Sequence, residues 1–309
     1  MPPPLSARPR PTVNPAQPRG PAERLAPFVF VALWSAGFSF VALGLPDSEP
    51  ITFLALRYAI VMALLVVALL VMRPPLPTRR RDWLDLVAVG VLLQALYFSL
   101  LYLALDLESS TGTIALIVSL QPVLVALLAP RIAGERVTWL RWAGLMLGLV
   151  GAALVIASRS AVGGLSAAGL ACAAGALGAI TAGTLYETRF GREHHPVTAN
   201  AVQIAVALAL TLPAALALEG FRVEWTADLA ISLAYLVLAN SLVAITLLLM
   251  MVRRGEASRV SALFFLVPPL AALIAWAVLG ESLPGLAWIG MVVATAGVAI
   301  ATRRARGSS

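Results

Sequence analysis

The chain contains no lysine, one cysteine and two histidines. Without lysine the P-loop motif GxxxxGK[ST] cannot occur, which excludes a P-loop ATPase. With Cys172 alone, neither an intramolecular disulfide nor a thiolate metal cluster can form. His194 and His195 are adjacent and belong to no HExxH motif, so we expect them to be solvated. The sequence therefore predicts no catalytic residue, no metal site and no cofactor.

Charged residues are also scarce, at 12% of the 309 residues against 60% hydrophobic. Soluble proteins carry about 25% charged residues. Runs of about 18 or more apolar residues are typical of membrane spans, which form helices because lipid cannot satisfy an open backbone. Ten such runs are predicted, at residues 25–45, 51–72, 83–105, 111–130, 139–157, 165–186, 197–218, 229–252, 260–279 and 284–302.

The arginines indicate how these spans are oriented. If the N-terminus is inside, 19 of the 22 arginines fall in inner segments, as expected for cytoplasmic loops. Residues 1–24, rich in proline and arginine, are predicted to be a disordered cytoplasmic tail, and residues 303–309 a second short one. Because the basic residues occupy short loops rather than one face, the net charge of +7 does not indicate a nucleic-acid partner.

The second half of the chain repeats the first. A constant shift of 146 residues places Pro122 on Pro268, and the same shift places Gln94 on Asn240. A match over most of the length predicts two duplicated units, residues 25–157 and 165–302. Five spans per unit is an odd number, so the halves must cross the membrane in opposite senses. The sequence thus predicts an all-α membrane protein with ten transmembrane helices in a five-plus-five inverted repeat, an architecture of many secondary transporters.

Four stretches carry a resemblance to a known family: LWSAGF at 33–38, ALRY at 55–58, QP…GERVTWLRWAGL at 121–145, and RRGEASRVSALFFLVPPLAALIAWAVLGE at 253–281. On these the chain resembles the EamA branch of the drug/metabolite transporter superfamily, over about residues 27–303. The resemblance implies a permease of the bacterial inner membrane, often an exporter of amino acids or related metabolites. A carrier of other organic metabolites or drugs stays open, as does a non-transporting membrane sensor or scaffold.

The few charges within the spans restrict the substrate. Phosphorylated substrates usually require several arginine or lysine donors, and Arg57 is the only cation predicted within the hydrocarbon region. A cationic drug would be expected to meet a mid-span carboxylate, but Asp85, Glu187 and Asp228 all lie at span ends. A small neutral or zwitterionic solute, such as an amino acid, fits best.

Three side-chain amides fall near mid-depth, Gln94, Gln121 and Asn240, on the third, fourth and eighth spans. An amide is costly to leave unpaired in hydrocarbon, so these groups either join helices or bind substrate. Because inverted-repeat carriers bind where the repeats meet, we expect them to line a cavity there. Trp34 and Tyr97 would be its apolar walls.

Two prolines and one arginine fall inside predicted spans. Pro122 and Pro268 each remove an amide donor in mid-span, giving either a static kink or a kink that lets the helix end swing. An intramembrane arginine is by default a functional-site hypothesis. The repeat partner of Arg57 is the neutral Gln203, and the Arg57 side chain is long enough to reach toward Asp47 or Glu49. Both observations favour a structural anchor.

Glycines and acids mark the ends and faces of other spans. Glu135 and Glu281 each follow a glycine and are predicted to be structural anchors at corners, with Thr138 capping the next helix. The fifth and tenth spans carry faces of small residues, suited to close packing within the chain or to a homodimer. These faces comprise Gly144, Gly148, Gly151, Gly290, Ala294 and Gly297.

Overall fold

The computed structural model describes residues 21–107, 114, 117–135, 137–159, 166–190, 194–254, 260–279 and 284–303. Across these residues the chain is almost wholly helical. The isolated β-bridge that the described part contains joins Ser48 to Val223.

The α-helices are α1 (Pro21–Gly44), α2 (Pro50–Met72), α3 (Arg80–Val89), α4 (Tyr97–Leu107), α6 (Gln121–Ile132), α7 (Trp139–Arg159), α8 (Ala167–Phe190), α9 (Pro196–Ala214), α10 (Ala227–Tyr235), α11 (Ile245–Arg254), α13 (Val267–Leu279) and α14 (Gly285–Thr302). Three π-helical segments continue them: η2 (Gly90–Leu96), η3 (Ala215–Glu219) and η4 (Leu236–Ala244). Two short 3-10 segments are η1 (Leu45–Asp47) and η5 (Ala262–Leu266). The run α3–η2–α4 forms one span and the run α10–η4–α11 another.

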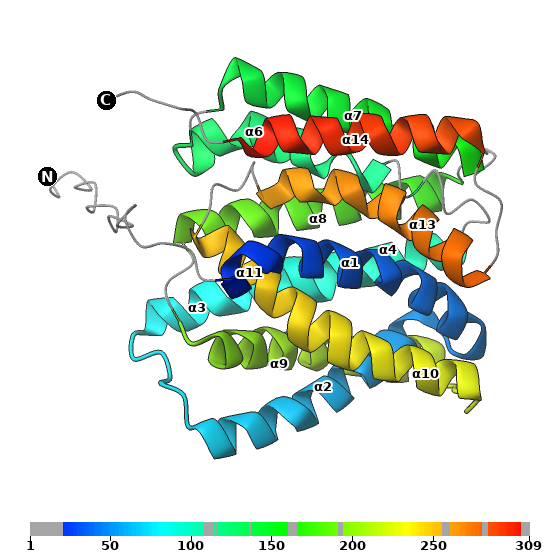
Figure 1. Ribbon diagram of the computed structural model, residues 1–309. Helices are drawn as coiled ribbons and strands as arrows, with labels where there is room; N and C mark the ends of the chain where they lie inside the picture. Colours follow the sequence, from blue (N-terminus) through cyan, green and yellow to red (C-terminus); the bar gives the residue numbers. More distant parts are fainter. Residues whose placement is uncertain are drawn as a thin grey trace, which may run out of the picture.

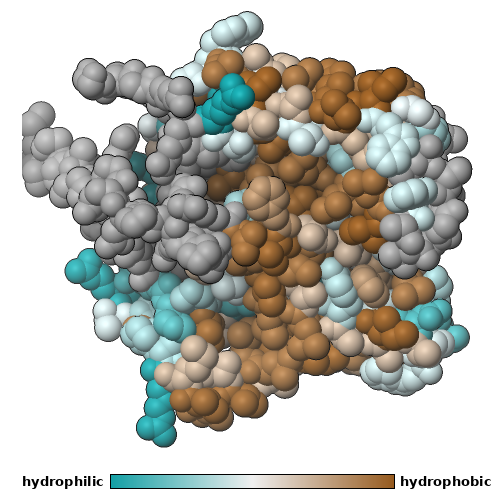
Figure 2. Space-filling view, viewed as in Figure 1, coloured by the Kyte–Doolittle hydropathy of each residue, from teal (hydrophilic) through white to brown (hydrophobic). Residues whose placement is uncertain are grey.

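Within the described residues, eight helical runs are long and apolar enough to cross a membrane, and each coincides with a predicted span. The predicted spans 111–130 and 260–279 correspond instead to shorter apolar helices, Gln121–Ile132 and Ala262–Ile274. Figure 2 shows apolar side chains gathered over the middle of the molecule, with hydrophilic ones mainly toward its left end. The protein is a multi-pass membrane protein.

Both prolines lie where one helical segment gives way to the next. Pro122 is in the first turn of α6, after a turn at Ser119–Leu120. Pro268 is the second residue of α13, directly after the 3-10 segment η5. Each proline thus lies at a departure from regular α-helix, and the kink or gating role of both stays a prediction. Proline is tolerated at such a start because the first-turn amides have no intrahelical partner in any case.

The contacts between helices occur in pairs that the 146-residue shift exchanges. Helix α7 packs along α14, its own counterpart, and α2 packs along α9. The span α3–η2–α4 packs against α8, and the span α10–η4–α11 packs against α1. In Figure 1 the start of α1, the end of α14 and the connection between α2 and α3 lie at the same end of the bundle.

Helices α7 and α14 approach each other closely through their small residues. A Cβ added to Gly144 would lie 2.5 Å from the Ala301 nitrogen, and one added to Gly151 would meet the backbone of Ala294. The small-residue faces are thus occupied within the chain. A homodimer through these helices stays a prediction and would have to use their outward sides, where Val292 is exposed.

Of the predicted corner residues, the structure describes Glu135 and Thr138. Thr138 Oγ1 accepts a hydrogen bond from the Arg141 amide at 3.3 Å, which confirms the predicted cap of α7. The Glu135 amide donates to the Ala129 carbonyl at 3.2 Å, closing the end of α6. Glu281 lies outside the described residues. The anchoring role of the two glutamates stays a prediction.

Candidate functional site

The segments η2 and η4 are π-helical parts of two long spans, and the repeat relates them to each other. The shift of 146 residues places Gly90–Leu96 on residues 236–242, within Leu236–Ala244. π-helical segments are rare and occur frequently at functional sites. Gln94 and Asn240 lie within them, buried to 1% and 4% exposure. The chain therefore departs from regular helix at the same place in both halves.

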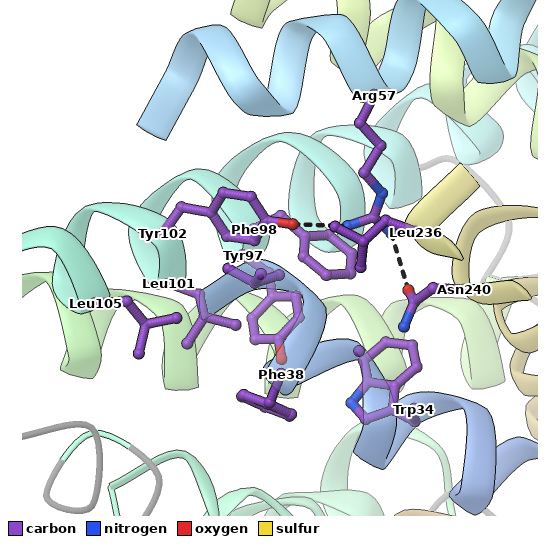
Figure 3. Close-up of a pocket in the computed structure, with 12 residues that line it drawn as sticks. Trp34, Phe38, Arg57, Tyr97, Phe98, Leu101, Tyr102, Leu105, Leu236 and Asn240 are labelled. Carbon is purple, nitrogen blue, oxygen red and sulfur yellow. Dashed lines mark hydrogen bonds between the residues drawn. The ribbon is translucent and has the colours of Figure 1, made fainter. Parts of the chain in front are cut away.

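A narrow cavity lies among α1, α2, α4 and η4 (Figure 3). Its lining comprises Trp34, Gly37, Phe38, Val41, Arg57, Tyr97, Phe98, Leu101, Tyr102, Leu105, Leu236 and Asn240. Its volume of about 20 Å³ holds about one water molecule. A metabolite the size of an amino acid can enter only when the surrounding helices separate.

Arg57 reaches into this cavity from α2 and is only 1% exposed. Its Nε donates to Ser241 Oγ (2.8 Å), its Nη1 to the Tyr102 hydroxyl (3.0 Å) and its Nη2 to Asn240 Oδ1 (2.9 Å). Two of these bonds are drawn in Figure 3. The guanidinium thereby joins the first half of the chain to the segment η4 of the second half.

Aromatic rings form the wall beside this cation. Arg57 Cζ lies 4.7 Å from the centroid of the Phe98 ring, within the range of a cation–π interaction. The Phe98 ring is in turn 6.0 Å from Trp34, centroid to centroid. Trp34 packs edge-on against Phe264 at 5.5 Å. The buried charge is therefore held by neutral oxygens and by the faces of rings.

The expected reach of Arg57 toward the outer acids is not observed. Asp47 Oδ2 instead accepts a hydrogen bond from Thr226 Oγ1 at 2.6 Å, and the partners of Arg57 within the described residues are neutral. Burial of Arg57 prevails over snorkelling because three hydrogen bonds and a ring face replace its hydration. The Arg57 side chain therefore does not snorkel toward Asp47 or Glu49 in this structure.

Three of the five predicted substrate-contacting residues meet in the cavity: Trp34, Tyr97 and Asn240. Gln94 is buried but is not part of the cavity lining. Neither polar atom of its side-chain amide has a hydrogen-bond partner among the described residues. Its backbone carbonyl accepts the Tyr58 hydroxyl at 2.7 Å, which ties η2 to α2.

Gln121 lies apart from the cavity. Its Nε2 donates to Ser261 Oγ at 3.1 Å and, more weakly, to Thr184 Oγ1 at 3.4 Å. These bonds connect the start of α6 with α8 and with the residues just before η5. This arrangement is the one expected of an amide that joins helices.

Sequence reasoning did not include several lining residues, among them Phe38, Phe98 and Tyr102. Helical spacing offered a signal, because residues four apart lie on one face of a helix. Phe38 follows Trp34 by four residues, and Leu101 follows Tyr97 by four. Ser241, which contacts Arg57, follows Asn240 directly in the sequence.

Comparison with known proteins places this geometry in a family. The chain matches the EamA-like transporter family over residues 25–157 and 167–303. It is 29% identical over 283 residues to a probable terminal-alkyne amino-acid exporter of Streptantibioticus cattleyicolor, covering 90% of this chain and 92% of that protein. It is 27% identical to the uncharacterized transporter YvbV of Bacillus subtilis, over 77% of each chain.

Two more distant similarities agree with these. The uncharacterized inner membrane transporter YedA of Escherichia coli K12 is 22% identical over 89% of each chain. A solved crystal structure, described only as that of a protein, shares the fold with a TM-score of 0.75 at 21% identity, over 91% of this chain and 96% of that one. With both halves of its length matched, the chain belongs to the EamA-like transporter family and is a transmembrane transporter of small molecules.

Proposed function

We propose that the protein exports small zwitterionic or neutral metabolites, amino acids in particular, across the bacterial inner membrane. The observation that carries this proposal is the cavity at the junction of the halves. There Arg57 and Tyr102 of the first half are hydrogen-bonded around Asn240 and Ser241 of the second. Its lining combines one cation with aromatic and aliphatic walls. The similarity to a probable terminal-alkyne amino-acid exporter supports the same substrate class.

The architecture is that of ten transmembrane helices in a five-plus-five inverted repeat, with both termini cytoplasmic. The 146-residue shift, the helix contacts that it exchanges and the 19 arginines in inner segments all support this arrangement. The shorter helices that contain Pro122 and Pro268 are the fourth and ninth spans. In inverted-repeat carriers the substrate binds near the midplane, between the repeats.

Transport requires the small cavity to open to one side at a time. The breaks before α6 and α13 are the points at which these spans bend, since a turn and a 3-10 segment there replace regular α-helix. The close pair α7 and α14 acts as the frame against which the other spans move. The substrate is released outward once the cavity opens on that side.

The experiment is transport by the purified protein in lipid vesicles. Vesicles loaded with labelled L-propargylglycine, L-leucine, L-threonine or L-phenylalanine are diluted, and the initial rate of efflux is measured against concentration. We expect efflux of at least one of these above that of protein-free vesicles. A sensor or scaffold would give no efflux with any of them.

Two variants locate the site. Asn240→Leu removes an amide from the cavity, and Gln94→Leu removes its repeat counterpart from the adjoining segment η2. Both are expected to weaken transport while the protein stays folded and inserted. Gly178→Ala is the matched control, because no described residue lies within 4 Å of a Cβ added at Gly178. Wild-type kinetics in both leucine variants would reassign the two amides to helix joining.

A further inference from the structure

The charge of Arg57 is fully buried yet not neutralised. A guanidinium carries five N–H donors, and three atoms of this one donate to neutral side chains of Ser241, Tyr102 and Asn240. No carboxylate forms an ion pair with it within the described residues, and none is part of the cavity lining. Three hydrogen bonds and a ring face replace its hydration, but its positive charge still lacks an opposite charge, a contribution that the described residues do not supply.

The geometry points to a negatively charged group of the substrate as that contribution. The guanidinium faces the cavity, as Figure 3 shows, and a planar guanidinium is suited to the two oxygens of a carboxylate. The Tyr102 hydroxyl accepts a bond from Arg57, which leaves its own O–H to donate to the same carboxylate. One cation in a narrow, ring-lined space suits a singly charged carboxylate better than a phosphate.

We propose that Arg57 binds the carboxylate of the transported substrate, and that Asn240 and Ser241 position the guanidinium for it. The inference rests on the proposed function, because it assigns a role to one group of the exported molecule. It also replaces the sequence-based expectation that Arg57 is a structural anchor. Among the described residues the cavity lining offers no carboxylate for an ammonium group, so the acid end of the substrate dominates recognition.

The repeat supplies a comparison within the chain. The position equivalent to Arg57 is Gln203 on α9, which is fully buried and neutral. Two equivalent positions therefore exist, but only one carries charge. A substrate with a single carboxylate needs one such position.

Three compounds that share the leucine side chain and differ in their end groups test the proposal in the wild-type protein. L-leucine has both end groups, L-leucinamide lacks the carboxylate, and 4-methylpentanoate lacks the amine. Binding to the purified protein is followed by tryptophan fluorescence, since Trp34 lines the cavity. We expect leucine and 4-methylpentanoate to bind with similar affinity and leucinamide about 10- to 100-fold more weakly, the range for a charge-assisted hydrogen bond. Leucinamide binding as well as leucine would overturn the proposal without any variant.

Variants of Arg57 then test the residue itself. Arg57→Gln installs the residue that the repeat has at the equivalent position, and the preference for leucine over leucinamide should fall to about one. Arg57→Lys keeps the charge without the planar fork and should retain part of the preference. Should Arg57→Gln fail to fold, Tyr102→Phe removes one donor and keeps the charge, and the preference should fall several-fold. The assignment is contradicted if the preference for leucine over leucinamide is unchanged in the stable variant, Arg57→Gln or Tyr102→Phe.

Flux and binding together separate the two proposals. Binding of 4-methylpentanoate without efflux of any amino acid would refute the exporter and leave the carboxylate site in place. Efflux of leucine and leucinamide at equal rates would refute the carboxylate site and leave the exporter. Replacing chloride salt by sucrose at equal osmolarity tests the other source of negative charge. Competition by chloride at the concentrations where 4-methylpentanoate binds would make Arg57 a site for inorganic anions and overturn the assignment.

Discussion

Gly37 sets how closely α1 approaches the residue that holds Arg57. A Cβ added at Gly37 would lie 2.5 Å from Asn240 Nδ2, whereas ordinary contact begins near 3.4 Å. Alanine at this position therefore requires the amide to move by about 1 Å. The Asn240 side chain is short and its Oδ1 accepts from Arg57 at 2.9 Å, so that displacement breaks the bond.

The expected size of the effect follows from two opposing contributions. A hydrogen bond to a charged group contributes about 1.5–3 kcal/mol. Alanine stabilises a helix by up to about 1 kcal/mol relative to glycine, which leaves a net loss of about 0.5–2 kcal/mol for Gly37→Ala. The same loss in substrate binding would weaken apparent affinity about 2- to 30-fold.

Thermal and chemical unfolding of the purified protein measure this loss without knowledge of the substrate. Gly178→Ala gains the same helix propensity without a contact and should be neutral or slightly stabilising. The decisive control is a double-mutant cycle with Asn240→Ala, which removes the colliding amide. In that background Gly37→Ala should no longer destabilise. Additive losses from the two changes would refute the idea that Gly37 acts through Asn240.

Two further predictions concern the frame and the topology. Gly151→Ala directs a methyl group at the backbone of Ala294, which cannot rotate away. The free energy of unfolding should therefore fall by about 1–3 kcal/mol or more. Wild-type stability would contradict the close approach of α7 and α14. In a cysteine-free background, Asp106→Cys should react with an impermeant thiol reagent from outside and Arg79→Cys only from inside. Labelling of both from one side would contradict the proposed orientation.

The extent of the spans could be predicted from the sequence because bilayer thickness fixes the length of an apolar helix. The predicted span 51–72 coincides with Pro50–Met72, and the predicted span 139–157 with Trp139–Ser158. The helices within the predicted spans 111–130 and 260–279 were harder to delimit from hydropathy. Their apolar composition continues across the turn before α6 and the 3-10 segment before α13. Hydropathy alone therefore does not reveal where α6 and α13 begin.

The site could be predicted only in part, because depth along a span is readable from sequence and rotation about its axis is not. Depth brought Asn240 into the cavity hypothesis, and Asn240 lines the cavity. Depth also included Gln121, which faces other helices. The partners of Arg57 lie 45 to 184 residues away along the chain, so its role depends on tertiary contacts that local patterns do not contain.

The duplicated unit relates buried polar positions of the two halves to one another, and their chemistry differs. The repeat relates Asn240 to Gln94 and Arg57 to Gln203, and all four side chains are buried. The side-chain amides of Gln94 and Gln203 have no hydrogen-bond partner among the described residues. Their counterparts differ, because Arg57 donates a hydrogen bond to Asn240 and faces the cavity. The proposed carboxylate role of Arg57 is compatible with its neutral partner Gln203, because a repeat duplicates the fold and not the chemistry of each position. A symmetric frame that must hold a molecule with unlike ends requires its two equivalent positions to differ.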